Sequence, residues 1–501
     1  MKKLKYSATQ YLLDDHQKTL FPLQLSRVLV EKVPDLLYKE IDHNQKGDPK
    51  DGTGFLSQIR CYSSKRGLNL RRTIKLDPVA ELYLYDLIYR QRNRFFDKPC
   101  KKRRSYGYRF LDNKDNRPIP ATTSYGEFRK KVRQSAARFK FHASLDISTY
   151  FNSLYHHDLV GWFENENKND TVEVQRFGSF FREITAGRSV DCLPQGLHPS
   201  KVIGAAFLSG LDEFHAIQSR LMLRFMDDIY LFDNNMNIIE ADIIAIQRYI
   251  GENGLSLNAE KTKLCQGPIC PPWDLEDVKV ELLELRREAL EAEYGILLDS
   301  DAPEIAEENE PLTTEQIDYL TSLLDEKDID ESDAELVLSV LRERTGDYVE
   351  HLVSFLERFP ALSRVVHSSA KYVQDKNELL NTLLQMVKQK RPLTEDQLFW
   401  IAKIVEDHLL SIVNIDDLLI ILNSHPAATT LSRAKLLEIP HKSLDDMRAE
   451  YFTGGRSDWL AWCAALGTRN VPKSKRNHLL GYFGKASRMN RIISICVKGL
   501  D

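Results

Sequence analysis

The sequence lacks the features of a secreted, membrane-spanning or zinc-binding protein. Its seven cysteines are scattered, and no two of them form a CxxC pair. We therefore expect free thiols in a reducing compartment rather than disulfides or a structural zinc site. No apolar run approaches the roughly 18 residues of a membrane span, and no hydrophobic segment follows the basic start Met1-Lys2-Lys3. The sequence predicts a soluble cytoplasmic protein with no membrane partner.

The charge of the chain is unevenly distributed. With 501 residues the chain exceeds what one hydrophobic core usually supports, so two or three domains are expected. Up to Cys270 there are 42 Lys and Arg against 32 Asp and Glu, whereas the remainder has 27 against 41. A basic first part suggests a polyanionic partner there, and the acidic second part is not expected to bind that partner over its whole surface.

The basic character is concentrated between residues 90 and 140, which contain 17 Lys and Arg against 4 Asp and Glu. Aromatic residues are interleaved with these cations. This combination suits a nucleic-acid surface, because cations neutralise phosphates while rings stack on bases. A solvated charged face is the simpler alternative. We expect Arg103, Arg104 and Arg109 to bind nucleic acid.

Two adjacent carboxylates stand in the segment Phe225-Met226-Asp227-Asp228. Short apolar runs on both sides predict a β-hairpin with both acids at its tip. Adjacent carboxylates repel each other, and a divalent cation relieves that repulsion. For an isolated pair, a solvated surface turn is the better interpretation, so other residues must decide.

A third carboxylate, Asp146, ends a half-buried strand predicted over residues 141–147. Asp146 alone would more often cap the following helix. If its strand neighbours the hairpin, however, the three acids converge. The predicted order of strand, helix, hairpin, helix and strand is that of a ferredoxin-like or palm sheet, with one helix expected over residues 200–217.

Four motifs together resemble the successive palm motifs of reverse transcriptases. They are Leu145-Asp146-Ile147 with Tyr150-Phe151, then Leu193-Pro194-Gln195-Gly196, then Phe225-Met226-Asp227-Asp228, and then residues 254–258 with Lys261-Thr262. Their order, spacing and identity all agree, whereas single motifs often match by chance. The segment Ser105-Tyr106-Gly107-Tyr108-Arg109 is similar to the fingers–palm junction, so the resemblance covers about residues 65–265.

The resemblance implies nucleotide addition by two Mg²⁺ ions, with Mn²⁺ as a substitute. Asp146 and Asp227 would bridge the metals and Asp228 would support one of them. One residue departs from the family pattern, because Phe225 replaces the usual hairpin tyrosine. Only a hydroxyl is lost by this change, so we expect activity to persist.

The resemblance also implies residues that bind the nucleotide. Phe151 would occupy the steric-gate position, where its ring clashes with a ribose 2′-OH and favours dNTPs. Gln195 would hold the nascent base pair, and Lys261 would lie near the leaving group. Arg72, together with Lys75, would clamp the triphosphate, because arginine grips phosphate with a planar fork.

The acidic part of the chain is predicted to be helical. Residues 311–317 resemble residues 392–398, and each copy has a Thr and a Gln three residues apart ahead of an apolar stripe, which is a capping box. Because the offset of 81 residues is about twice the ~40-residue period of HEAT-like pairs, we expect a short α-repeat domain, with an irregular bundle as the alternative.

The predicted fold class is an α+β reverse-transcriptase fingers and palm, with a ferredoxin-like palm sheet, followed by an all-α, HEAT-like repeat domain. The predicted domains are residues 1–140 (N-terminal helices and basic fingers), 141–270 (palm), 271–311 (helix and acidic linker) and 312–501 (helical repeats).

No thumb, maturase, endonuclease or RNase H signature follows the palm. This architecture resembles the bacterial abortive-infection and unknown-group defence reverse transcriptases. That resemblance implies antiphage defence, a homo-oligomer, and DNA synthesis that is untemplated and primed from a protein tyrosine, or that copies an RNA or DNA template. The alternatives are a retron-like or intron-like enzyme copying a dedicated RNA, and an inactive nucleic-acid-binding scaffold.

Overall fold

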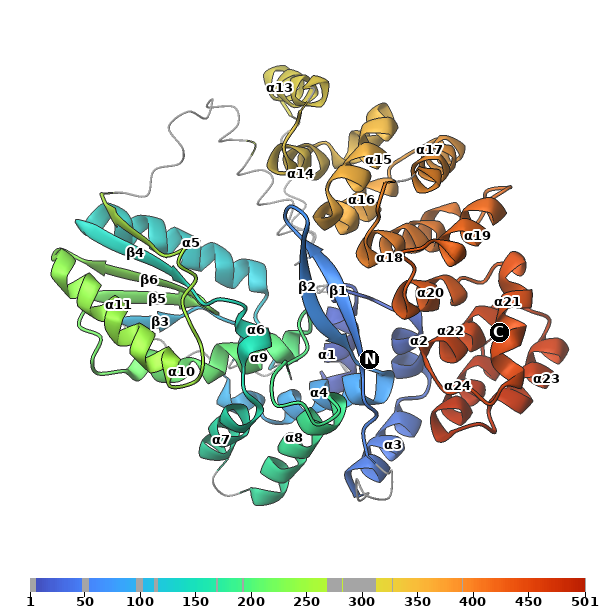
Figure 1. Ribbon diagram of the computed structural model, residues 1–501, viewed down its shortest axis with the longest axis horizontal. Helices are drawn as coiled ribbons and strands as arrows, with labels where there is room; N and C mark the ends of the chain where they lie inside the picture. Colours follow the sequence, from blue (N-terminus) through green and yellow to red (C-terminus); the bar gives the residue numbers. More distant parts are fainter. Residues whose placement is uncertain are drawn as a thin grey trace, which may run out of the picture.

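The computed structural model describes residues 6–46, 54–95, 102–111, 116–167, 170–191, 193–267, 282, 312–326, 328–389 and 391–500. Apart from Leu282, the predicted helix and acidic linker over 271–311 lie outside the described residues. A part that contains a five-stranded sheet and a part made only of helices lie on opposite sides of a β-hairpin (Figure 1). No helix among these described residues has the length and apolar character needed to cross a membrane.

The central hairpin consists of β1 (Ile59–Lys65) and β2 (Asn69–Lys75), which pair antiparallel from Ile59↔Lys75 to Lys65↔Asn69. The strand β2 ends at Lys75, two residues before Asp77. The Asp77 side chain accepts hydrogen bonds from the backbone of Val79 and Ala80, so it caps the following helix. Four N-terminal helices pack on one another: α1 (Ala8–His16), α2 (Gln24–Lys32), α3 (Pro34–Lys46) and α4 (Pro78–Arg90).

The five-stranded sheet has the order β3-β5-β6-β4-β7. Its strands are β3 (Arg103–Ser105), β4 (Phe141–Asp146), β5 (Leu221–Phe225), β6 (Asp228–Asp233) and β7 (Lys263–Gln266). The edge strand β3 pairs parallel with β5, and the other neighbours are antiparallel, so the sheet is mixed. The order β5-β6-β4-β7 matches the predicted ferredoxin-like arrangement.

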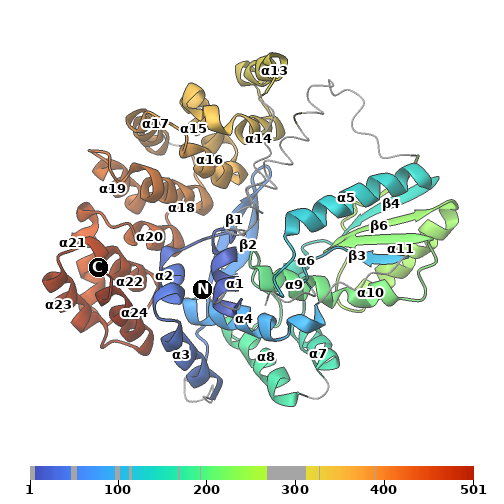
Figure 2. The same ribbon diagram turned by 180° about the vertical axis from the view of Figure 1, so that it is seen from behind.

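Alternating side chains of β6 divide the sheet into two packed faces. Ile229 and Leu231 belong to a large core shared with α11 (Met236–Gly251), while Phe232 packs with Phe128 of α5 (Ala121–Arg138). Helices cover the sheet on both faces as a result, as Figures 1 and 2 show.

The connection between β4 and β5 consists of short helices. They are α6 (Tyr150–Ser153), α7 (His156–Glu166), α8 (Thr171–Ile184), α9 (His198–Phe207) and α10 (Ser209–Glu213). The prediction of one helix over 200–217 was therefore wrong. Arg224 of β5 donates a hydrogen bond to the carbonyl of Ala205, which competes with continuation of α9 where the two helices part.

The helical part begins with α13 and ends with α24. Its helices are α13 (Thr314–Asp325), α14 (Glu331–Val340), α15 (Val349–Arg358), α16 (Ser363–Ala370), α17 (Lys376–Lys388), α18 (Glu395–Ile404), α19 (Asp416–Ser424), α20 (Thr430–Leu437), α21 (Asp445–Thr453), α22 (Trp459–Gly467), α23 (Lys473–Phe483) and α24 (Arg488–Lys498). Each even-numbered helix from α14 to α24 contacts the next, which gives a curved row (Figure 1). Both predicted capping boxes, Thr313 with Gln316 and Thr394 with Gln397, are confirmed.

The helical part packs directly on the N-terminal helices. The large core continues from α1, α2 and α4 into α20, α22 and α24. Glu438 accepts hydrogen bonds from the backbone N–H groups of Gln24 and Leu25, so a carboxylate of the helical part lies at the N-terminus of α2. The rings of Phe21 and Phe399 meet edge to face with centroids 5.1 Å apart.

Candidate active site

The turn between β5 and β6 carries the two adjacent aspartates. Phe225 pairs with Asp228 across the ladder, so Met226 and Asp227 form a two-residue turn, and the predicted hairpin is confirmed. Met226 has a φ of 56°, a left-handed conformation that costs a residue with a side chain on the order of 1 kcal/mol. The surrounding structure must therefore hold this turn in place.

A buried guanidinium holds the turn. The Arg224 side chain is 1% exposed and forms a two-pronged ion pair with Asp212, with Nε–Oδ1 and Nη2–Oδ2 distances of 3.1 and 2.5 Å. Arg224 Nη1 also donates to the carbonyl oxygen of Met226 at 3.2 Å. Arg224 thus connects the aspartate turn to α9 and α10 through one planar group.

Asp146 lies directly beside the turn. It is the last residue of β4 and is the cross-strand partner of Asp228. Directly opposed residues have Cβ atoms roughly 5 Å apart and project from the same face, so the sheet brings the predicted acids together. Asp146 Oδ1 accepts from Lys261 Nζ at 3.1 Å, which also brings the predicted leaving-group lysine to the site.

Burial and neighbouring negative charge disfavour the ionised forms of Asp227 and Asp228. Burial raises the pKa of Asp227 to about 6, and the charges of Asp228 and Asp146 act in the same direction. Burial and the charge of Asp146 likewise raise the pKa of Asp228. Clustered carboxylates with raised pKa values are typical of a site that binds a cation or transfers protons.

The donor chemistry of the site fits a hard divalent cation. Carboxylate oxygens are preferred ligands of Mg²⁺ and Mn²⁺, and a cation would stabilise the ionised forms of Asp227 and Asp228, whose pKa values burial and neighbouring charge raise. In the present geometry, however, no group of three His, Cys, Asp or Glu side chains among the described residues is arranged to hold an ion. The nearest cation to Asp146 is the Lys261 ammonium.

Phe151 and Gln195 lie in two other segments of the same part of the chain. Phe151 lies on α6, and its ring packs near Gly204, where an added Cβ would be 3.5 Å from Cε1 of Phe151. The backbone of Gln195 exchanges two hydrogen bonds with Thr73 Oγ1, at 2.8 and 3.0 Å. Gln195 therefore joins the palm to the central hairpin, and its buried Oε1 has no hydrogen-bond partner among the described residues.

Phe225 keeps the packing expected of the replaced tyrosine. Its ring centroid lies 5.1 Å from that of Tyr125, 5.7 Å from that of Phe128 and 5.8 Å from that of Tyr108. The ring therefore fills an aromatic cluster beside the aspartates, where no hydroxyl is needed for packing.

The structure places Arg72 and Lys75 on opposite faces of β2. Arg72 Nε lies 3.0 Å from Asp191 Oδ2, and Arg60 Nε lies 3.4 Å from the same oxygen. Lys75 is 5% exposed and its Nζ lies 3.1 Å from Oε2 of the buried Glu81. The expected pairing of Lys75 with Arg72 is thus corrected, because side chains three residues apart on a strand point to opposite faces.

Two other cations of the hairpin lie within electrostatic reach of the aspartates. Burial lowers the pKa of Arg71, while the charges of Asp396 and Asp227 act to raise it. The pKa of Lys65 is also lowered by burial, and Asp146 and Asp227 oppose that effect. Lys65 and Arg71 both interact electrostatically with Asp227. They are therefore the hairpin cations whose charge acts on the carboxylates.

The three arginines predicted to bind nucleic acid have structural partners. Arg103 donates to the carbonyls of Ile217 and Ser219 at 2.5 and 2.9 Å. Arg104 lies over the Tyr106 ring at 4.5 Å, and Arg109 is 8% exposed and donates to the Ser105 carbonyl. Arg103 and Arg109 therefore help to hold the edge of the sheet, and their contact with nucleic acid stays a prediction. Exposed cations do lie along α5, namely Lys130, Lys131 and Arg138.

With this geometry established, comparison with known proteins decides the class of the domain. Residues 84–321 match the family model described as reverse transcriptase (RNA-dependent DNA polymerase). The chain carries a reverse transcriptase domain. This domain is of the RNA-directed DNA polymerase class, whose members are nucleotidyltransferases. A search of curated proteins gives no match.

Two telomerase structures are similar to the chain that carries this reverse transcriptase domain. Telomerase from Candida albicans, in complex with the TWJ fragment of telomeric RNA, has 13% identity and a TM-score of 0.28 over 66% of this chain and 64% of that chain. Apo telomerase from Candida tropicalis has 11% identity and a TM-score of 0.28 over 85% of this chain and 73% of that chain. The chain thus spans slightly less than two thirds of the first of these telomerases.

Sequence reasoning missed the residues that support the reverse transcriptase site. Arg224 stands in an otherwise apolar strand, and a lone charge in such a strand is a detectable signal of a buried ion pair. Its partner Asp212 and the Arg72 partner Asp191 lie in connecting segments, and no sequence pattern marks them.

Proposed function

We propose that the protein is an active DNA polymerase that adds deoxynucleotides by two-metal nucleotidyl transfer. The observation that carries this proposal is the register Asp146↔Asp228, which places a third carboxylate beside the Asp227-Asp228 turn. Three clustered carboxylates serve no purpose in a domain that only binds nucleic acid, because their mutual repulsion is unfavourable without cations.

The proposed roles rest on the resemblance of the motifs and are supported by the clustering of the carboxylates. Asp146, Asp227 and Asp228 hold two Mg²⁺ ions, which when bound stabilise the attacking 3′ oxygen and the leaving pyrophosphate. The Lys261 ammonium leaves Asp146 and binds the leaving pyrophosphate. Phe151 limits space at the 2′ position of the sugar, and Gln195 supports the nascent base pair.

The triphosphate is assigned to the central hairpin. Lys65 and Arg71 lie within electrostatic reach of the carboxylates and bind the phosphate oxygens. When the nucleotide enters, the Arg72 side chain releases Asp191 and binds phosphate. This exchange is possible because the Arg72 side chain is 44% exposed and its partner is a single carboxylate.

Incorporation of labelled nucleotide tests this proposal. Purified protein with Mg²⁺ and each dNTP, with and without RNA or DNA template and primer, should incorporate label, whereas the double variant Asp227→Ala, Asp228→Ala should not. The matched control is Glu164→Ala, Glu166→Ala, which removes two exposed carboxylates of α7 and should retain activity. Equal incorporation by the catalytic variant would overturn the assignment.

We further propose antiphage defence by abortive infection as the biological role. The support is architectural: a reverse transcriptase domain is followed by successive contacting helices, which we interpret as a HEAT-like repeat domain. This role predicts a cytoplasmic homo-oligomer and untemplated, protein-primed synthesis. Label that remains on the protein after denaturation supports protein priming, whereas label that requires an added RNA favours a retron-like enzyme. Loss of phage resistance in the Asp227→Ala, Asp228→Ala strain tests the defence role.

A further inference from the structure

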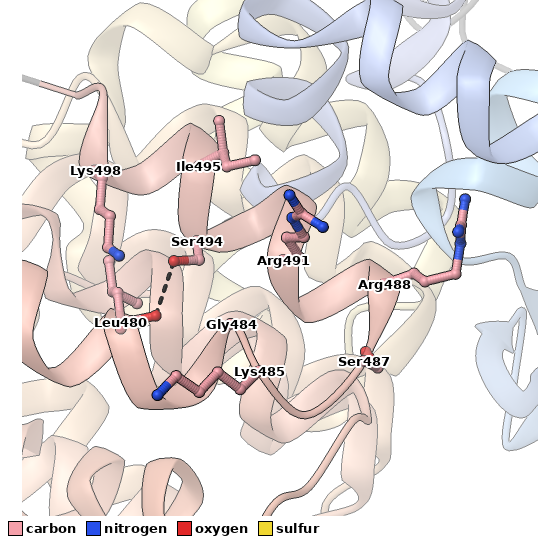
Figure 3. A pocket seen from close by; sticks show the side chains of 10 residues that line it. Leu480, Gly484, Lys485, Ser487, Arg488, Arg491, Ser494, Ile495 and Lys498 are labelled. Carbon is pink, nitrogen blue, oxygen red and sulfur yellow. Dashed lines mark hydrogen bonds between the residues drawn. The ribbon is translucent and has the colours of Figure 1, made fainter.

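The last two helices carry a basic surface within the acidic part of the chain. Residues 473–501 contain seven Lys and Arg against the single acid Asp501. Four of these cations, Lys485, Arg488, Arg491 and Lys498, line a pocket of about 710 Å³ between α23 and α24 (Figure 3). The described residues that line it include no carboxylate. The surface thus differs in sign from the part of the chain that surrounds it.

Glycines and a serine shape the floor of this basic pocket. An added Cβ at Gly484 would lie 2.9 Å from the Cβ of Ser494, so α24 approaches the end of α23 closely only because this side chain is absent. Ser494 Oγ donates to the Leu480 carbonyl at 2.8 Å across the same contact. At Gly481, an added Cβ would lie 4.0 Å from Lys498 Nζ. The missing side chains leave the lysine ammonium accessible above the helix backbone.

Most of the positive charge in the pocket is not neutralised. Arg488 forms an ion pair with Glu40 of α3, with Nη2 2.8 Å from Oε2, yet its side chain remains 58% exposed. Lys485, Arg491 and Lys498 form no ion pair with any described residue. Uncompensated cations around one concave surface attract a polyanion.

An exposed aromatic ring lies beside the cations. Tyr482, on the same helix as Gly481, is 60% exposed, and Lys485 Nζ lies 5.7 Å from the centre of its ring. The His478 ring lies on the other side, 5.1 Å from Tyr482. Cations that bind phosphates next to a ring that stacks on a base form the usual combination of single-strand binding surfaces. An acidic protein or a free phosphate would use the cations but would have no need of the ring.

We propose that the pocket between α23 and α24 binds single-stranded nucleic acid. Lys485, Arg491 and Lys498 bind successive phosphates, and Tyr482 stacks on an adjacent base. Helices α23 and α24, which form the pocket, lie at the end of the helical part, away from the sheet that carries the aspartates (Figure 1). It is therefore a second contact for a strand, and its existence does not depend on whether the aspartates are catalytic.

Hydrogen exchange of the full-length protein locates the site independently of synthesis. The protein carries Asp227→Ala and Asp228→Ala and is mixed with single-stranded DNA in the absence of dNTPs. Peptides from residues 473–498 should exchange more slowly when DNA is added, and the change should disappear in the additional variant Lys485→Glu, Arg491→Glu. Protection confined to the palm, with unchanged exchange in α23 and α24, would overturn the proposal and leave the polymerase assignment intact.

The affinity for single-stranded DNA is compared between a variant of the pocket and a matched control variant. Lys485→Glu with Arg491→Glu should raise the Kd for single-stranded DNA about tenfold or more and reduce the salt dependence of log K by about 1.4, because two phosphate contacts are lost. The control Lys371→Glu, Lys388→Glu makes the same charge change at exposed positions of the helical part and should change the Kd about twofold or less. Equal weakening by the two double variants would show a diffuse charge effect and contradict a built site.

The ring and the ligand class are tested separately. Tyr482→Ala should weaken binding about fivefold or more, and Tyr482→Phe should restore it, because stacking needs the ring and not the hydroxyl. Single-stranded RNA and DNA should compete, since both present phosphates and unpaired bases. Complete displacement by inorganic phosphate at equal phosphate concentration would identify a simple anion site and contradict the proposal.

Discussion

Ser64 of β1 donates its backbone N–H to Oδ2 of Asp396 at 2.9 Å, so a residue of the helical part pairs with the edge of the central hairpin. Tyr62, two residues earlier, donates in the same way to Glu395 Oε2 at 3.0 Å. Alternate N–H groups of an edge strand point away from its partner strand, and here the two acids at the start of α18 take the place of a third strand. The helical part therefore holds the hairpin that carries Lys65 and Arg71.

The burial of Asp396 at this contact makes the free energy of unfolding depend on pH. Burial raises the pKa of Asp396 from 3.8 to about 7, despite the opposing hydrogen bonds from Ser64. A carboxyl with a raised folded-state pKa binds its proton more tightly in the folded protein, so stability falls as pH rises from about 4 to 7. Asp396→Asn removes this titration and keeps an acceptor oxygen. Relative to wild type, the variant should gain on the order of 2–4 kcal/mol between pH 4 and 8.

Thermal unfolding from pH 4 to 8 measures this gain as a growing difference in Tm. The control Glu450→Gln removes an exposed carboxyl of the helical part and should follow the wild-type curve throughout. Parallel wild-type and Asp396→Asn curves would contradict the role of this carboxyl.

The raised pKa of Asp227 predicts a pH-dependent demand for Mg²⁺. Below the pKa of about 6 a proton occupies the carboxyl and competes with the cation. The Mg²⁺ concentration for half-maximal incorporation should therefore rise about tenfold per pH unit below pH 6 and level off above it. In the absence of Mg²⁺ at pH 8, Asp227→Asn should raise the Tm by removing repulsion. Added Mg²⁺ should stabilise the wild type more than the variant, and identical metal responses would exclude Asp227 as a ligand.

Replacing Arg224 should damage both the fold and the active site. Arg224→Met leaves the Asp212 carboxylate without its partner and the Met226 carbonyl without a donor. Removing one partner of a buried ion pair costs about 3–5 kcal/mol. The control Arg220→Met alters a side chain that is 65% exposed and should cost about 0.5 kcal/mol or less. Denaturant unfolding measures both changes, and a loss below 1 kcal/mol for Arg224→Met would show that the turn is held by other contacts.

The sequence predicted the sheet because periodicity and register are local properties. Short apolar runs mark β5 and β6, a half-buried pattern marks β4, and a two-residue turn after Phe225 leaves few alternatives for the strand pairing. The convergence of Asp146 with Asp228 follows from that pairing. Capping boxes at Thr313 and Thr394 were equally predictable, because a Thr and a Gln three residues apart each accept a hydrogen bond from the other's backbone N–H.

Residues whose partners are distant in sequence were not predictable in the same way. Arginines at positions 103 and 109 look like phosphate ligands in a basic segment, yet one binds loop carbonyls over a hundred residues away and the other is buried. Lys75 differs, because its partner Glu81 is only six residues away, but the sequence does not show that α4 packs so as to bury this ion pair. Charge counts describe a surface only after packing has decided which charges reach it.

Substitutions of two hairpin cations should affect nucleotide binding and stability separately. Arg71→Ala should raise the KM for dNTP about tenfold or more, because a charge-assisted contact to phosphate is worth about 1.5–3 kcal/mol. Lys75→Met should instead lower the Tm, since it leaves the buried Glu81 without its ammonium partner, and should change the KM little. Steady-state kinetics with parallel melting curves test the split. A KM effect at Lys75 that matches the effect at Arg71 would restore the original assignment.

Phe151 should decide which sugar the enzyme accepts. Its ring lies on α6, five residues after the β4 strand ends at Asp146, and packs beside Gly204. Phe151→Val shortens the side chain and should lower the preference for dNTP over rNTP about tenfold or more, because the wild-type ring and a 2′-OH would compete for the same space. Phe225→Tyr is the control, since it enlarges a ring in the neighbouring aromatic cluster and should leave the preference unchanged. The ratio of kcat/KM values for the two nucleotides measures the effect. A ratio that Phe151→Val leaves at the wild-type value would remove Phe151 from the sugar site and shift the search to other side chains near Asp146.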